Sequence, residues 1–163
     1  MGRTAPARCG NRDTPAEMPP AQPSAVPAHA IHPPPRLAVI GFGNMGAAVV
    51  TGALASRVLE PSEVLVVETN AAKRNEAGRF GCRTSDDPRA AGSARDVLLA
   101  VKPQSFPDLA PQLAVRAGRT VFVSVMAGLS GERILAAIGG TASSTHAVVR
   151  AMPNTPCKLG VPR

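Results

Sequence analysis

The sequence predicts an α/β fold with a doubly wound, mostly parallel sheet. Short apolar runs recur along the chain and alternate with segments of helical pattern, which is typical of strands joined by crossover helices. The first run, residues 37–40, leads directly into a glycine-rich turn and a helix start. Hydrophobic residues make up 44% of the chain but aromatic residues only 2%, which favours a core of small aliphatic side chains between strands and helices.

The first 35 residues differ in composition from the rest. Proline recurs there among alanine, arginine and serine, and large apolar side chains are almost absent. Such a segment cannot bury enough apolar surface to offset the entropy lost on ordering. It also lacks the apolar stretch of a secretory signal. We therefore expect residues 1–35 to be a disordered extension and residues 36–163 to form one dinucleotide-binding domain.

The strands are predicted from continuous apolar runs, which are typical of strands buried on both faces of a parallel sheet. In chain order they are expected at 37–40, 64–67, 81–84, 96–101, 120–125 and 147–151, the third being weakly marked.

The helices are predicted between these strands. They are expected at 45–59, 71–79, 106–116 and 131–138, with a brief helical stretch after Asp86, Asp87 and Pro88. Pro107 and Pro111 limit the third long helix, because proline lacks the backbone donor that a helix interior needs. Ser130 precedes the last helix as its predicted N-cap.

A glycine motif follows the first strand. Gly41, Phe42, Gly43, Asn44, Met45 and Gly46 form the pattern G-x-G-x-x-G. The first glycine permits a tight turn, the second lets a pyrophosphate approach the backbone, and the third lets the helix pack closely on the strand. The N–H groups at the helix start favour an anionic phosphate. A purely structural turn is the alternative, but the order strand, turn and helix favours a dinucleotide site of Rossmann type.

The end of the second strand bears on the choice of dinucleotide. Glu68 lies where an acidic residue usually accepts a hydrogen bond from the adenosine ribose, and its charge repels a 2′-phosphate, which favours NAD. Thr69, Asn70, Lys73 and Arg74 follow at once and could hold a phosphate, although Lys73 and Arg74 also suit a solvated helix start. The residues alone leave NAD(H) and NADP(H) open.

Later strand ends converge on the same rim of a parallel sheet, where ligands bind. Lys102 and Pro103 follow one strand, Met126 to Gly128 another, and Met152 to Pro156 the last. Lys102 is either a cation at the solvent edge or a positive group beside the nicotinamide or an anionic substrate. Asn154 is either a turn former or an amide held in a rigid loop.

Charge, cysteines and histidines exclude several classes of function. The net charge is +7, but the basic residues are scattered without aromatic interleaving, so we expect no nucleic-acid partner. Cys9, Cys82 and Cys157 form no C-x-x-C pair, which argues against a disulfide framework or zinc and for a cytoplasmic location. The three histidines are isolated, so no metal site is expected. No apolar run is long enough to span a membrane.

Four stretches together carry a resemblance: GFGNMG, AVKPQ, SVMAGLS and VVRAMPNTP. They are similar to the amino-terminal domain of pyrroline-5-carboxylate reductase, over roughly Arg36 to Gly160. The resemblance implies NADP(H)-dependent reduction of 1-pyrroline-5-carboxylate to L-proline, with NAD(H) as the alternative. It implies a pyrophosphate held by Ile40, Gly41, Phe42, Gly43, Asn44 and Met45, an adenosine end at Glu68, Thr69 and Asn70, and a nicotinamide side at Ala100, Val101, Lys102, Pro103, Ala127, Gly128 and Asn154.

The resemblance also implies a part that this sequence does not contain. In the family, a helical carboxyl-terminal domain follows, joins two subunits and supplies the substrate site, so the sheet here is expected to be truncated and the catalytic residues are unknown. Two alternatives remain: a dinucleotide-binding fragment without catalysis, and a related imine or hydroxyacid reductase.

Overall fold

The computed structural model describes residues 1–2, 33–113, 119–139 and 146–153. In the compact unit, which begins at Pro33, the described residues form a six-stranded sheet in the order β3-β2-β1-β4-β5-β6. The strands are β1 (Leu37–Ile40), β2 (Val64–Val67), β3 (Arg83–Ser85), β4 (Asp96–Leu99), β5 (Val121–Ser124) and β6 (Ala147–Arg150). Every neighbouring pair is parallel. This is the Rossmann strand order, so the predicted fold class is confirmed.

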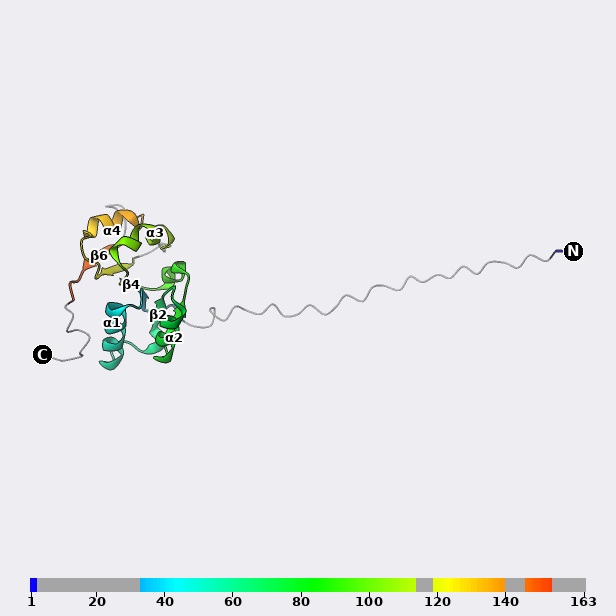
Figure 1. Ribbon diagram of the computed structural model, residues 1–163, viewed down its shortest axis with the longest axis horizontal. Coiled ribbons are helices and arrows are strands. Elements are labelled where there is room, and N and C mark those ends of the chain that lie inside the picture. Colours follow the sequence, from blue (N-terminus) through cyan, green and yellow to red (C-terminus); the bar gives the residue numbers. More distant parts are fainter. Residues whose placement is uncertain (3–32, 114–118, 140–145, 154–163) are drawn as a thin grey trace. The chain divides into compact units, whose positions relative to one another are not determined.

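Helices and 3₁₀ turns connect the strands (Figure 1). The helices are α1 (Asn44–Ala55), α2 (Ala71–Arg79), α3 (Phe106–Leu109) and α4 (Gly131–Ala137). The 3₁₀ turns are η2 (Pro61–Glu63), η3 (Pro88–Ser93), η4 (Pro103–Ser105) and η5 (Ala110–Gln112).

The sheet separates two apolar cores, because successive side chains of a strand point to opposite faces. On one face, Ala38 and Ile40 of β1 pack with Phe106 of α3 and Ile134 of α4. On the other face, Val39 packs in a cluster with residues of α1 and α2, such as Val50 and Ala77. The central strands β1, β2 and β4 are thus buried on both sides, which explains their apolar runs.

Helix α1 ends four residues before the predicted Leu59. Arg57 adopts a left-handed conformation with φ of 56°, while its N–H donates to the Leu54 carbonyl and that of Val58 to the Ala53 carbonyl. These two hydrogen bonds form a Schellman motif, which satisfies the last carbonyls and terminates the helix. The sequence prediction missed it because the residue in the left-handed position is not glycine.

Three other predicted boundaries differ for identifiable reasons. β3 starts at Arg83 instead of residue 81, because Gly81 has φ of 80° in the turn after α2. β4 ends at Leu99 instead of residue 101, because its partner β1 ends at Ile40 and the chain turns at Gly41. The helix expected over 106–116 is α only to Leu109 and then 3₁₀ to Gln112, with residues 114–118 outside the described part.

The compact unit begins three residues before the predicted boundary at Arg36. The carbonyl of Pro33 accepts a hydrogen bond from Arg83 Nη1 at 2.9 Å, and the carbonyl of Pro35 accepts one from the Arg95 N–H at 3.1 Å. Pro35 is itself buried. Contacts with the domain therefore include two prolines of the predicted extension, Pro33 and Pro35.

Candidate dinucleotide site

A cavity of about 450 Å³ opens at the carboxyl ends of β1, β2 and β4. The neighbours β1 and β4 continue into helices on opposite faces of the sheet, which makes this the switch point where open α/β sheets bind ligands. The cavity is lined by Ile40, Gly41, Gly43, Val67, Glu68, Thr69, Lys73, Asp86, Pro88, Ala100, Val101, Lys102, Ser105, Asp108, Leu109 and Gln112. Eight of the predicted site residues are among them: Ile40, Gly41, Gly43, Glu68, Thr69, Ala100, Val101 and Lys102.

The three glycines of the motif meet different surroundings. Gly41 has φ of 94°, and a Cβ there would lie 2.9 Å from the Ala100 carbonyl oxygen. A Cβ on Gly46 would overlap the Gly41 carbonyl, so α1 can pack this closely on the turn only with glycine at this position. A Cβ on Gly43 would meet nothing within 4 Å, and Gly43 lines the cavity. The backbone beside Gly43 is therefore open to a group of the size of a phosphate.

The start of α1 suits the same group. Gly43 is the N-cap of this helix and makes no side-chain capping hydrogen bond. The helix runs for 12 residues, so its N-terminal end carries a partial positive charge that faces anions favourably. The glycine turn and the helix start thus fit the pyrophosphate of a dinucleotide.

Glu68 connects the end of β2 to the glycine turn. Its Oε2 accepts a hydrogen bond from the Phe42 N–H at 2.8 Å, and its Oε1 accepts one from the Asn70 N–H at 2.9 Å. The Thr69 hydroxyl lies 3.5 Å from the same Oε1. Burial raises the pKa of this carboxyl, but these hydrogen bonds and the charge of Lys73 together outweigh burial and leave the pKa below its ordinary value.

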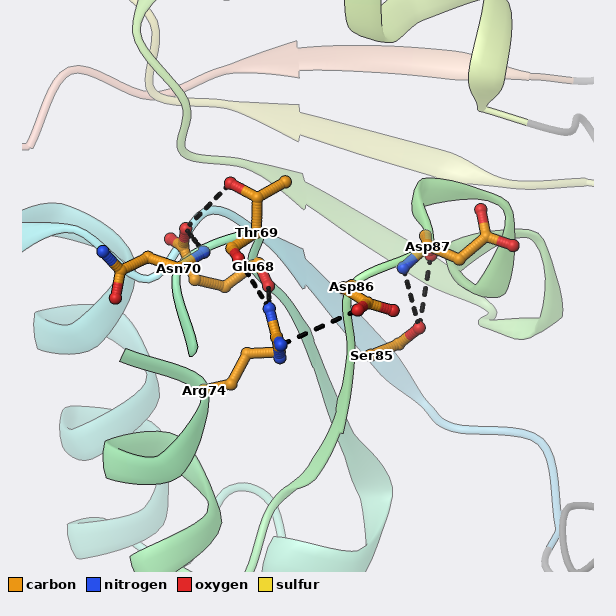
Figure 2. Close-up of polar contacts among 7 residues, drawn as sticks. All are labelled: Glu68, Thr69, Asn70, Arg74, Ser85, Asp86 and Asp87. Atoms are coloured by element: carbon orange, nitrogen blue, oxygen red, sulfur yellow. Dashed lines mark hydrogen bonds and ion pairs between the residues drawn. The ribbon is translucent and has the colours of Figure 1, made fainter. Parts of the chain in front are cut away.

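Arg74 holds the same strand end from α2. Its Nη1 donates to the Glu68 carbonyl at 2.8 Å and to the Thr69 carbonyl at 2.7 Å, and its Nη2 lies 3.6 Å from Asp86 Oδ2. Figure 2 shows the guanidinium between the loop after β2 and Asp86. Lys73, by contrast, lines the cavity. Arg74 therefore holds a loop within the protein, whereas Lys73 borders the cavity.

The wall opposite β2 was not predicted from the sequence. Ser105, Asp108, Leu109 and Gln112 come from the end of η4, from α3 and from η5, and all four line the cavity. Their segment directly follows Lys102 and Pro103, which were predicted to belong to the site. This wall could have been predicted from the sequence, because a helix that begins at the carboxyl end of a switch-point strand borders the ligand site.

The other predicted site residues that the structure describes do not line this cavity. Phe42 is buried, Asn44, Met45 and Gly46 belong to the first turn of α1, Asn70 caps α2 and Pro103 begins η4. Ala127 and Gly128 form an exposed turn after β5, with φ of 75° at Gly128. Asn154 lies outside the described residues.

Two features are absent from the part of the chain that the structure describes. No group of three or more His, Cys, Asp or Glu residues in that part of the chain could hold a metal ion. No helix over the same residues is long and apolar enough to cross a membrane.

Comparison with known proteins gives both a family and relatives. A family model described as NADP oxidoreductase, coenzyme F420-dependent, matches residues 36–128. The chain is 35% identical over 127 residues to a pyrroline-5-carboxylate reductase of Synechocystis and 39% identical over 128 residues to one of Thermus thermophilus. Each match covers 77% of this chain and 46% or 45% of the relative, so the chain spans about half the length of these curated relatives.

A solved structure gives the same likeness. The pyrroline-5-carboxylate reductase of Coxiella burnetii matches with a TM-score of 0.69 and 26% identity, over 77% of this chain and 46% of that one. The resemblance that the four sequence stretches indicated is confirmed.

Proposed function

Because this chain belongs to the family described as NADP oxidoreductase, coenzyme F420-dependent, we propose that it binds NADP(H) at the switch-point cavity, with NAD(H) as the alternative. We further propose that it serves as the cofactor-binding part in the reduction of 1-pyrroline-5-carboxylate to L-proline. The substrate is suggested by the names of the curated relatives.

One observation carries the cofactor proposal: Gly43 faces open space in the cavity while Gly41 and Gly46 are packed against backbone. If the motif needed glycine only for the conformation of the turn, its second position, Gly43, would not have to be open to the cavity beside the helix start. The pyrophosphate would lie against Gly43 and the first turn of α1. The adenosine end would lie toward Thr69 and Lys73, and the nicotinamide toward Ala100, Val101 and Lys102.

The nicotinamide, when bound, supplies the hydride that a cyclic imine accepts at carbon. The residues of this chain would bind the dinucleotide and orient its nicotinamide. The Lys102 side chain, next to Pro103 at the start of η4, places a positive charge on the cavity wall, which suits an anionic substrate or cofactor phosphate. Rigid placement of two reactants accounts for a large share of the rate in such reactions.

The other properties of the whole protein are proposals as well. Assembly into a homo-oligomer through a further domain, and a cytoplasmic location, follow from the resemblance and from the cysteine pattern. They are tested by the mass of the particle in solution and by cell fractionation.

The first experiment is a titration of the 163-residue chain with NADPH and with NADH. Binding is measured by calorimetry and by the shift in thermal unfolding. A ligand that binds only the native state stabilises it by about 2.7 kcal/mol at 100 times its dissociation constant. Stabilisation by either dinucleotide supports the site, and absence of binding by a folded sample refutes it.

Turnover is measured separately, by oxidation of NADPH with 1-pyrroline-5-carboxylate. Cofactor binding without turnover would favour the alternative of a dinucleotide-binding module. Turnover with other imines or hydroxyacids in place of 1-pyrroline-5-carboxylate would favour a related reductase.

A further inference from the structure

Strand β6 forms one edge of the sheet, and its outer side has no partner strand among the residues that the structure describes. Its four residues, Ala147–Arg150, are apolar up to the final arginine. The opposite edge, β3, consists of Arg83, Thr84 and Ser85, which are all charged or polar. Such side chains protect an edge strand from pairing with another chain. The two edges therefore differ, and β6 is the one that is open to pairing.

One face of β6 continues an apolar row that crosses the sheet. The row consists of register partners in four neighbouring strands: Val39, Leu98, Val123 and Val149. Register partners point to the same face of a sheet. Val39 is fully buried and Leu98 is 3% exposed, since both belong to the core cluster that includes residues of α1 and α2. Val149, at the end of the row, is 50% exposed.

Helix α4 packs on the other face of β6, beside which it lies in Figure 1. The Val148 side chain packs against the core on that face, and a Cβ on Gly131 at the start of α4 would lie 3.7 Å from Val148 Cγ1. Val149 is the next residue of the strand, so its side chain points away from this helix. The open apolar surface is therefore the face of β6 that bears Val149.

The outward backbone groups of β6 belong to Val148 and Arg150. The Ala147 N–H donates to the Thr120 carbonyl at 3.1 Å, and the Ala151 N–H donates to the carbonyl of the last residue of β5 at 2.9 Å. Successive residues of a strand direct these groups to opposite sides, so the N–H and carbonyl groups of Val148 and Arg150 point away from β5. They are available to a further strand.

We propose that the 163-residue chain associates through β6 with a second copy of itself. The two β6 strands pair antiparallel about a twofold axis that passes between the two Val149 residues. The backbone groups of Val148 in one copy then exchange hydrogen bonds with those of Arg150 in the other. The same strand is used on both copies, so the contact closes at a dimer. It is separate from assembly through a further domain.

Charge and apolar contact favour this register over its neighbours. It places Arg150 opposite Val148 of the other copy, whereas a register centred on Arg150 would oppose two arginines, which is destabilising. It also brings the two Val149 side chains together on the open face, so the apolar row continues from one copy into the other. A register centred on Val148 would place Val149 opposite Ala147 and lose that contact.

The first test measures the mass of the chain in solution, without dinucleotide, by sedimentation at increasing concentration. We expect a reversible equilibrium between monomer and dimer. Val149→Lys should weaken the dimer by about tenfold or more, because two lysines would face each other across the strand pair. Thr84→Lys places the same charge on an exposed position in the middle of β3, at the other edge, and should leave the equilibrium unchanged.

A second pair of variants tests the backbone contact. Arg150→Pro removes the N–H that donates to the other copy but no hydrogen bond to β5, and an edge strand tolerates proline at such a position. It should weaken the dimer by about tenfold. Arg150→Gln removes the same charge but keeps the N–H, so it should not weaken the dimer. Circular dichroism shows that each variant is folded.

Cross-linking tests the register itself. Residues that face each other in a non-hydrogen-bonded antiparallel pair have Cα atoms about 4.5 Å apart, which is within the range of a disulfide. With Cys9 and Cys157 replaced by serine, Val149→Cys should join two chains through position 149 on mild oxidation. Thr84→Cys in the same background should not join them.

Three results would overturn the inference. The first is a mass of one chain at every concentration up to about 300 µM, which would leave residues 154–163 to cover the edge. The second is an equal loss of dimer in Val149→Lys and Thr84→Lys, and the third is cross-linking through position 84 instead of 149. Failure of the chain to bind either dinucleotide would refute the proposed function alone, because the mass is measured without ligand.

Discussion

Gly41 lies against the backbone of Ala100, so that a Cβ at position 41 would be 2.9 Å from the Ala100 carbonyl oxygen and 3.1 Å from its carbonyl carbon. The contact joins the ends of the central strands β1 and β4, where the Ala100 N–H also donates to the Ile40 carbonyl at 2.9 Å. The floor of the cavity is therefore backbone packed on backbone. A larger side chain at position 41 or 100 would therefore alter the floor of the cavity.

Gly41→Ala should destabilise the domain by about 3 kcal/mol, because alanine is strained at φ of 94° and its methyl group presses on a rigid carbonyl. Chemical denaturation followed by circular dichroism measures the loss, since the chain has no tryptophan or tyrosine. A variant as stable as wild type would show that the turn relaxes freely.

Gly43→Ala should destabilise the domain by no more than about 1 kcal/mol, because alanine is a poorer N-cap than glycine but the new methyl group meets nothing within 4 Å and φ is −78°. It should weaken dinucleotide binding by about tenfold or more, since the methyl group occupies the space proposed for the pyrophosphate. Gly52→Ala is the matched control. Position 52 is exposed within α1, so alanine there should stabilise by about 0.5–1 kcal/mol without affecting binding. Equal binding by Gly43→Ala and wild type would place the pyrophosphate elsewhere.

The contribution of Glu68 to stability should depend on pH. Its pKa is lowered in the folded state from an ordinary 4.5, so the ionised group stabilises the domain above that pH. This stabilisation is lost as the pH falls through the lowered pKa. The difference in unfolding free energy between wild type and Glu68→Gln should thus be constant near neutral pH and shrink below about pH 4.5. Denaturation series at several pH values measure it, and a difference that grows in acid would contradict the hydrogen-bond geometry.

Arg74→Lys should destabilise the domain by about 1 kcal/mol, because an ammonium cannot reproduce the planar guanidinium that donates to two carbonyls and faces Asp86. Lys73→Gln, one residue away on an exposed position, should be nearly neutral for stability. Thermal unfolding of the two variants without ligand tests the contrast. Equal losses would mean that Arg74 is as solvated as its neighbour.

Much of the fold could be predicted because its signals are local. Apolar runs such as residues 64–67 and 97–99 are buried on both faces and alternate with helices, which is enough to indicate a parallel sheet. The glycine motif could be located from its spacing after β1. Helix α1 was predicted too long because the left-handed conformation of Arg57, which ends the helix, is not expected for an arginine.

The strand ends that line the cavity could be predicted from the sequence, but the residues that contact them could not. Glu68 and Lys73 follow β2 and could be found from position alone. The bond from Phe42 to Glu68 spans 26 residues, and the wall formed by Ser105, Asp108 and Gln112 depends on how α3 packs on the sheet. Neither follows from spacing.

The sequence by itself thus determined the alternation of strands and helices, the glycine turn and the strand ends at which a ligand is expected to bind. These depend on hydrophobic periodicity and on backbone sterics, which act over a few residues. Only the tertiary structure decided that Glu68 holds the turn, that Arg74 holds the next loop and that Lys73 borders the cavity. Strand order and register set these distances, and hydrogen bonds between loops form only once the sheet has brought the strand ends together.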